Sequence, residues 1–261
     1  MERFEVLYRQ LFKSICEYCA KVGKEEAFVT QFPVAGKQYT IPEITSQNAD
    51  KVRFMLVGRC TNGWGSQKQV PFLAPYEEKY VQLAKEYITD RSIASKWRED
   101  AQSAGYNINK SSFWRTARDI WAELAHPGEA AEADWYEHII WTNLFPVGPK
   151  KEGNASNMLC DAQTDTAIDL FREIIRYFQP THVLVESGMN WFSFTYKGQH
   201  HSFLDCIDLS SSNYCVVGWC VFPETKSHII IANRPEGKKD EEYCNDIIQT
   251  FNAMTDAGVV K

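Results

Sequence analysis

Four short runs that are apolar on both faces constrain the fold of this chain more than any other feature. The runs are 54–57 (FMLV), 138–141 (HIIW), 182–185 (HVLV) and 228–232 (HIIIA). Continuous apolar strands are typical of parallel sheets, which helices cover on both faces. The sequence therefore predicts an α/β fold, a three-layer α/β/α arrangement with a central four-stranded parallel sheet.

Helical patterns lie beside these runs and supply the covering layers. Apolar residues recur at helical spacing in 113–124, 166–178, 240–254 and in an N-terminal helix that carries Phe4, Leu7, Leu11 and Ile15. We interpret these stripes as core positions of a single domain over 1–261. Within it we expect an N-terminal helical extension, 1–50, and an inserted hairpin, 193–227.

Charge and cysteine content limit the classes of protein. The 28 Lys and Arg against 34 Asp and Glu give a net charge of −6, which disfavours a protein that coats duplex nucleic acid. The eight cysteines are scattered, as is typical of reduced, mostly buried thiols in a cytoplasmic protein. The start MERFEVLYRQ is charged and no apolar run approaches 18 residues, so we expect neither secretion nor a membrane span.

The segments that follow the four runs share an unusual composition. They are rich in Gly, Asn, Pro and aromatic residues, and three of them carry Arg or Lys: GRCTNGWGSQKQVPF, TNLFPVGPKKEGNAS, ESGMNWF and NRPEGKKDEE. Ligands of open parallel sheets bind beyond the carboxyl ends of the strands. We therefore predict that these segments meet in one pocket.

Together the four segments resemble the uracil-DNA glycosylase superfamily, and most of all its single-strand-selective monofunctional branch. GRCTNGWG followed by VPFL is similar to the family's GMNPGPFG and VPFG, and WTNLFPVG with GNAS is similar to its second motif. VLVESGMNW is similar to the third strand, and NRPEGKK stands where the family has HPSP. The resemblance implies removal of a base that is flipped out of DNA, by N-glycosidic hydrolysis without a cofactor.

The resemblance assigns roles to particular residues. Those with candidate catalytic roles are Asn62, Asn233 and Cys60, and those with candidate substrate-binding roles are Gly58, Arg59, Trp64, Phe72, Asn143 and Arg234. Asn143 can read a pyrimidine edge or cap loop backbone, and Phe72 can stack on a base or pack in the core.

Two catalytic positions depart from the family pattern. Cys60 stands where the family has Asp or Asn, and Asn233 stands where it has His. A thiol is a poor group for holding water, although Asn62 could hold it instead, and a neutral amide stabilises a departing anion less than a His does. Two hypotheses follow: a glycosylase with reduced activity, or a nucleobase, nucleotide or single-strand binding module that has lost catalysis. A Cys60 nucleophile with a His partner is a further possibility.

Other motifs support no cofactor or metal. Cys16 and Cys19 lie on one helix face, and 61–159 contain no cysteine that could complete an iron–sulfur cluster. His200 and His201 have no ligand at metal spacing, so we interpret them as a solvated or hairpin pair. Phosphate-loop, dinucleotide and zinc-protease motifs are absent from the sequence.

Overall fold

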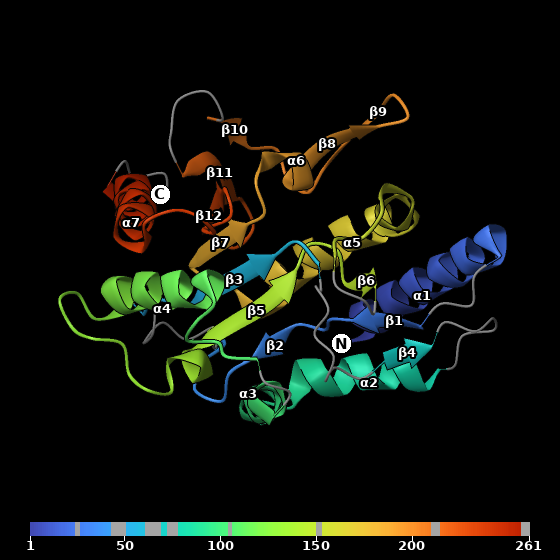
Figure 1. The fold of residues 1–261 in the computed structure, drawn as a ribbon, viewed down its shortest axis with the longest axis horizontal. Helices are drawn as coiled ribbons and strands as arrows, with labels where there is room; N and C mark the ends of the chain where they lie inside the picture. The colour runs from blue at the N-terminus through green and yellow to red at the C-terminus, as the bar shows by residue number, and fades with distance from the viewer. Residues whose placement is uncertain are drawn as a thin grey trace.

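A computed structural model describes residues 1–23, 27–42, 51–60, 69–71, 78–103, 106–149, 153–209 and 215–256. Its largest sheet has seven strands in the order β10-β11-β12-β7-β3-β5-β2 (Figure 1). In chain order these strands are β2 (Val34–Ala35), β3 (Phe54–Gly58), β5 (Ile139–Asn143), β7 (His182–Glu186), β10 (Ile207–Asp208), β11 (Val216–Phe222) and β12 (Ser227–Ala232).

The predicted apolar runs form four neighbouring strands of this sheet. β12, β7, β3 and β5 pair in parallel, and Leu56 lies between Leu184 and Trp141. The α/β class is confirmed, but the sheet is seven-stranded and mixed, so the prediction of four parallel strands was too narrow. It left out β2 at one edge, and at the other edge β11 and β10, which the sequence analysis places in the inserted hairpin; all three pair antiparallel.

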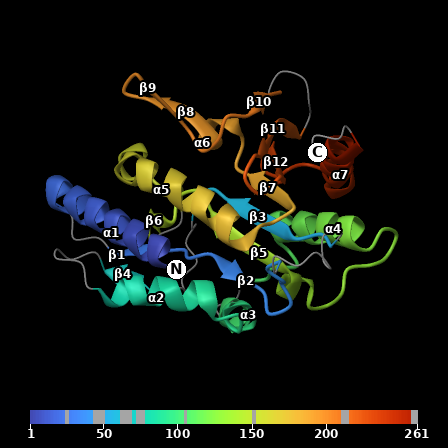
Figure 2. The ribbon, with the colours of Figure 1, turned by 180° about the vertical axis from the view of Figure 1, so that it is seen from behind.

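Helices lie against both faces of the sheet, because its strands are apolar on both sides. Phe54 and Leu56 point into one core, and Met55 and Val57 point into the other. The first core is shared with α3 (Ile93–Ser103), α4 (Ser112–Ala125) and α7 (Asp240–Asp256), and the second with α1 (Glu2–Val22), α2 (Lys79–Thr89) and α5 (Asn157–Phe178). Figures 1 and 2 show these two sets of helices from opposite sides.

The N-terminal segment is more integrated than a helical extension. α1 packs along α5, and Leu11, Phe12 and Ile15 are fully buried between the helices and the sheet. The segment also contains β2 and β1 (Ala27–Thr30). β1 pairs antiparallel with β4 (Gln69–Pro71) and β6 (Val147–Pro149) in a second, three-stranded sheet.

The predicted hairpin insertion is shorter than 193–227. Among the described residues of this segment, β8 (Ser193–Tyr196) and β9 (Gln199–Ser202) form the separate hairpin, which projects from the body of the molecule after the short helix α6 (Met189–Phe192) (Figure 1). β11, the other part of the predicted insertion, is an integral strand of the main sheet because it pairs along the length of β12.

Two general properties of the chain bear on the sequence analysis. All eight cysteines lie in described residues and none forms a disulfide; Cys16 and Cys19 are both buried in the core under α1. Among the described helices, none combines the length and the apolar character that crossing a bilayer requires.

Candidate functional site

The parallel strands bring the predicted residues to one edge of the sheet. Gly58, Asn143 and Glu186 are the last residues of β3, β5 and β7, and Asn233 follows the last residue of β12. Of the predicted site residues, Gly58, Arg59, Cys60, Asn143, Asn233 and Arg234 lie in this part of the structure. Asn62, Trp64 and Phe72 lie outside the described residues, so their predicted roles stay predictions.

Gly58 and Asn143 are in direct contact across neighbouring strands. They are register partners of β3 and β5, and the Leu144 N–H donates to the Gly58 carbonyl at 2.9 Å. A Cβ on Gly58 would lie 2.4 Å from Asn143 Oδ1 and 3.6 Å from the Phe113 ring. The half-buried Asn143 amide can therefore lie over the backbone of position 58 only because that residue is glycine.

Arg59 links the end of β3 to the loop after β7. Its Nε donates to the Ser187 carbonyl at 2.7 Å, and its guanidinium lies 5.3 Å from the centre of the Trp191 ring. Partial burial lowers the pKa of Arg59, and the charge of Arg234 lowers it further. Because the ordinary pKa of an arginine is far above neutral pH, the guanidinium still keeps its charge. A fixed, half-buried cation therefore lies at this edge.

Gly188 and Asn233 adjoin this cation. Gly188 has φ 78°, and a Cβ there would lie 3.4 Å from Asn233 Oδ1 and 3.7 Å from an Arg59 terminal nitrogen. The Asn233 N–H donates to the Cys215 carbonyl at 2.8 Å, which fixes the backbone of Asn233. The structure thus brings Arg59 and Asn233 together as predicted. Arg234 forms an ion pair with Glu236, which offsets its charge.

Cys60 is held as a neutral thiol beside these groups. Its Sγ accepts a hydrogen bond from the Ala155 N–H at 3.4 Å, and burial raises the pKa of the thiol. Burial also raises the pKa of the nearby Cys160 thiol to about 12. Because a nucleophilic cysteine needs the thiolate, these surroundings disfavour the possibility of a Cys60 nucleophile.

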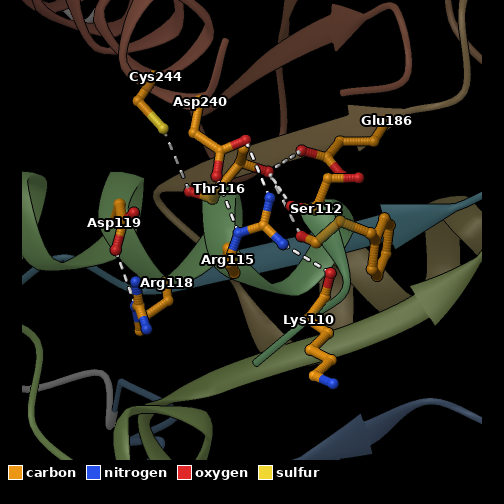
Figure 3. Close-up of polar contacts among 10 residues, drawn as sticks. Lys110, Ser112, Arg115, Thr116, Arg118, Asp119, Glu186, Asp240 and Cys244 are labelled. Atoms are coloured by element: carbon orange, nitrogen blue, oxygen red, sulfur yellow. Dashed lines mark hydrogen bonds and ion pairs between the residues drawn. The ribbon is translucent and has the colours of Figure 1, made fainter. Parts of the chain in front are cut away.

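Sequence reasoning missed Glu186, which lies beneath the same edge. Its side chain is 1% exposed, and Oε1 accepts a hydrogen bond from Thr116 Oγ1 of α4 at 3.1 Å (Figure 3). Among the described residues, no hydrogen bond reaches Oε2. Burial raises the pKa of Glu186 well above its usual value, because a buried site disfavours the charged carboxylate. The signal in the sequence is a glutamate that directly follows the apolar run HVLV.

The surroundings of Glu186 tie the site to the helices α4 and α7. Tyr243 of α7 lies close enough to Glu186 for its hydroxyl group to lower the pKa of that carboxyl, against the larger effect of burial. The same hydroxyl group donates a hydrogen bond to the Asn233 carbonyl at 2.8 Å. An ion pair between Arg115 and Asp240, with 2.8 Å between Nε and Oδ2, joins the same two helices (Figure 3). The position of Asn233 therefore depends on how α7 is seated on the sheet.

A second group of polar residues lies near the amino ends of the strands. Single donor atoms of Glu132, Asp134 and His138 lie within 4.8 Å of one another, and Glu132 also lines a cavity of about 570 Å³ beside Arg98 and Arg118. Carboxylates and imidazole are ligands of divalent metals. However, Asp134 already accepts a hydrogen bond from Gln38 at 2.9 Å, and Glu132 is exposed, so we assign no metal to this cluster.

Comparison with protein-family models and with curated proteins found no match to this chain. Its function must therefore be argued from the site. The groups gathered at the carboxyl edge are two amides, Asn143 and Asn233, a fixed cation, Arg59, and a neutral thiol, Cys60. Such a set offers hydrogen-bond donors and acceptors for a polar, planar ligand and positive charge for an anion.

Proposed function

We propose that this protein is similar to DNA base-excision glycosylases and binds a flipped-out base at the carboxyl edge of its sheet. The observation that carries the proposal is the position of Asn143, whose amide lies against Gly58 at the end of the central strands. An asparagine amide carries one acceptor and two donors, which suits the hydrogen-bonding edge of a pyrimidine. Helices on both faces of the sheet agree with the three-layer α/β/α arrangement that the resemblance implies.

The nearby charges suit a single strand better than a long duplex. Arg59 provides a fixed cation at the edge, whereas Arg234 is paired with Glu236 and the whole chain carries a net charge of −6. Extended contact with duplex phosphates requires several cations in a row. A short single-stranded or damaged segment requires fewer, because base contacts contribute part of the affinity.

Hydrolysis of the N-glycosidic bond would depend on groups that stabilise the departing base less well than the family's histidine does. Asn233 can donate a hydrogen bond to the departing base, and Arg59 beside it supplies positive charge. Loss of one well-placed donor typically costs about 10²–10³ in rate. We therefore propose slow excision, with Asn62 holding the water and with Phe72 and Trp64 contacting the base as the resemblance implies.

A second candidate function is binding without catalysis, to a nucleobase, a nucleotide or single-stranded nucleic acid. The environment of Cys60 favours it, because the protonated sulfur is engaged with the Ala155 amide and cannot act as a base toward water. The two candidates differ in one measurable product, the abasic site.

The experiment that tests the proposal uses single-stranded and mismatched oligonucleotides containing uracil, hypoxanthine or xanthine. Binding is measured by fluorescence anisotropy, and excision by alkaline cleavage of abasic sites. We expect Asn143→Asp to weaken binding at least tenfold, because it replaces the amide donors with an acceptor and adds a negative charge. Asn252→Asp makes the same change on the exposed surface of α7 and should have little effect.

Restoring the family's groups separates the two candidates. Asn233→His combined with Cys60→Asn should raise excision if the fold is that of a weak glycosylase. A double variant that binds the oligonucleotide but yields no abasic site would favour the binding module. If neither the wild type nor the variants bind any of the oligonucleotides, the site serves another ligand and the proposal is wrong.

A further inference from the structure

Two cysteines outside the candidate site face each other across the edge of the main sheet. β10 and β11 pair antiparallel, with Ile207 opposite Trp219 and Asp208 opposite Gly218. The same register, extended by one residue, places Cys206 opposite Cys220. Cys206 directly precedes β10, so this extended register brings the two cysteines close together although 13 residues of sequence separate them.

The hydrogen-bond pattern shows which kind of pair they form. The Leu209 N–H donates to the Val217 carbonyl at 2.9 Å, which makes 209 and 217 a hydrogen-bonded pair. Hydrogen-bonded and non-hydrogen-bonded pairs alternate along an antiparallel ladder, so Cys206 and Cys220 form a non-hydrogen-bonded pair. Such pairs have a Cα separation of about 4.5 Å, which is within the range that a disulfide spans.

The two side chains also contact each other. Residues opposite each other in an antiparallel pair project to the same face of the sheet, and the neighbouring Cys220 thiol is the largest cause that raises the pKa of Cys206. Cys220 is 6% exposed and belongs to the core beside α5, whereas Cys206 is half-buried and packs against that core from the edge strand. A small oxidant can therefore reach the Cys206 thiol first. The Cys220 thiol then lies close enough to attack the oxidised sulfur of Cys206.

We propose that Cys206 and Cys220 are an oxidative modification site, at which a peroxide converts the two thiols into an intramolecular cross-strand disulfide. The Cys206 thiolate attacks one peroxide oxygen of hydrogen peroxide, and the O–O bond breaks to leave a sulfenic acid and, after proton transfer, water. The Cys220 sulfur then attacks the Cys206 sulfur, and the S–O bond breaks to release a second water. The two thiols together lose two protons and two electrons, and the peroxide accepts them.

The surroundings of the pair determine its rate. The hydrogen bond to Cys220 and burial raise the pKa of Cys206, so little thiolate is present at neutral pH and oxidation begins slowly. Raising the pH should accelerate it. The same burial shields the product from thiol reductants, so this disulfide should be slow to form and slow to reduce.

The cross-link would fix the edge of the sheet. β10 is a two-residue edge strand, and a disulfide would tie it covalently to β11. β11 pairs in turn with β12, the strand that leads to Asn233. Oxidation should therefore slow hydrogen exchange of the β10 amides, because local opening of this edge would be suppressed.

In the test, the whole chain is treated with hydrogen peroxide at pH 7 and at pH 9. The remaining thiols are then alkylated, and the peptides are mapped without reduction of disulfides. Cleavage before Asp205 and Asp208 and after Trp219 separates Cys206, Cys215 and Cys220 into different peptides. We expect a Cys206–Cys220 cross-linked peptide, with a loss of two hydrogen atoms, that forms several-fold faster at pH 9 than at pH 7.

Variants control for general oxidation. Cys206→Ser and Cys220→Ser should each abolish the cross-link, whereas Cys16→Ser with Cys19→Ser, in a different part of the core, should leave its rate unchanged. The wild type itself decides the question if a serine variant does not fold. Peroxide that leaves both thiols open to alkylation after denaturation, or that joins Cys206 to Cys215 instead, would overturn the proposal.

Discussion

The side-chain oxygen of Asn143 occupies the space that a β-carbon on Gly58 would need. The distance from that β-carbon position to Asn143 Oδ1 is 2.4 Å, well inside van der Waals contact. The two residues end neighbouring parallel strands, so the contact links the sheet register directly to the orientation of the amide. An exchange at Gly58 therefore tests the proposed base-reading role of Asn143 without touching Asn143 itself.

Gly58→Ala should displace the Asn143 amide and leave the fold intact, because the obstructing atom is the end of a side chain that can rotate. We expect binding of a uracil-containing single strand to fall about tenfold, the value of roughly one hydrogen bond. Asn143→Ala should have a similar effect. Because both changes remove the same interaction, the double variant should bind no worse than either single variant, and additive losses would contradict the proposed role.

Arg59→Lys should lower stability and weaken binding although the charge is kept. Lysine cannot reproduce the contact of Nε with the Ser187 carbonyl together with the cation–π contact between the guanidinium and the Trp191 ring. We expect a loss of about 1 kcal/mol in the free energy of unfolding, measured with urea, since the group is half-exposed and partly screened. Arg118→Lys on α4, where the arginine pairs with its neighbour Asp119, provides the matched control and should change stability by less.

The strands at the centre of the sheet could be predicted because their own residues reveal them. Runs such as 182–185 are apolar on both faces, and this pattern belongs to a strand that is covered twice. β2, in contrast, has two residues, Val34 and Ala35, which is too short for any periodicity. β11 was recognised as a strand-like segment, but its partner was not, because strand pairing is decided by contacts between distant residues.

The same distinction applies to the candidate site. Gly58 and Asn143 end predicted strands, so their convergence followed from the parallel order of the sheet. The raised pKa of Glu186 could not be predicted, because the burial that causes it depends on α4 and α7, which come from distant parts of the chain. Helices α2 and α3 were also missed, although Tyr80, Val81, Ala84 and Ile88 form a helical stripe.

Glu186→Gln should make the protein more stable at neutral and alkaline pH. Burial raises the pKa of Glu186 in the folded state above its value in the unfolded chain, so the folded state binds the proton more tightly. Stability of the wild type therefore falls as the pH rises above the unfolded pKa, since the unfolded chain gives up this proton more easily. Glutamine keeps an acceptor for Thr116 and removes this penalty.

Urea midpoints for the wild type and Glu186→Gln, measured between pH 4 and pH 9, check this prediction. The two proteins should be nearly equal near pH 4 and should diverge as the pH rises, with the variant more stable. Glu123→Gln on the exposed end of α4 should show no such divergence. A variant that is less stable at every pH would show that the carboxyl group contributes a hydrogen bond that the amide cannot replace.

His182 should lower the free energy of unfolding as the pH falls, whereas Glu186 lowers it as the pH rises. It begins β7 directly beside His228 of β12, and the Phe251 ring covers it at a centroid distance of 4.9 Å. Burial, and next the charges of His228 and Arg53, lower the pKa of His182 from 6.5 to about 4. Because the folded pKa lies below the unfolded value, this group's contribution is complete above pH 6.5 and is lost as the pH falls toward 4.

The lowered pKa of His182 corresponds to a loss of about 3 kcal/mol in the free energy of unfolding as the pH falls from 6.5 to 4. His182→Gln cannot be protonated there, so its free energy of unfolding should fall less steeply from pH 7 to pH 4 than that of the wild type. The lower absolute stability caused by losing the contact with Phe251 does not affect this slope. His200→Gln, on the exposed β8–β9 hairpin, should retain the wild-type slope. Equal slopes for His182→Gln and the wild type would mean that His182 is not the group through which acid destabilises the sheet.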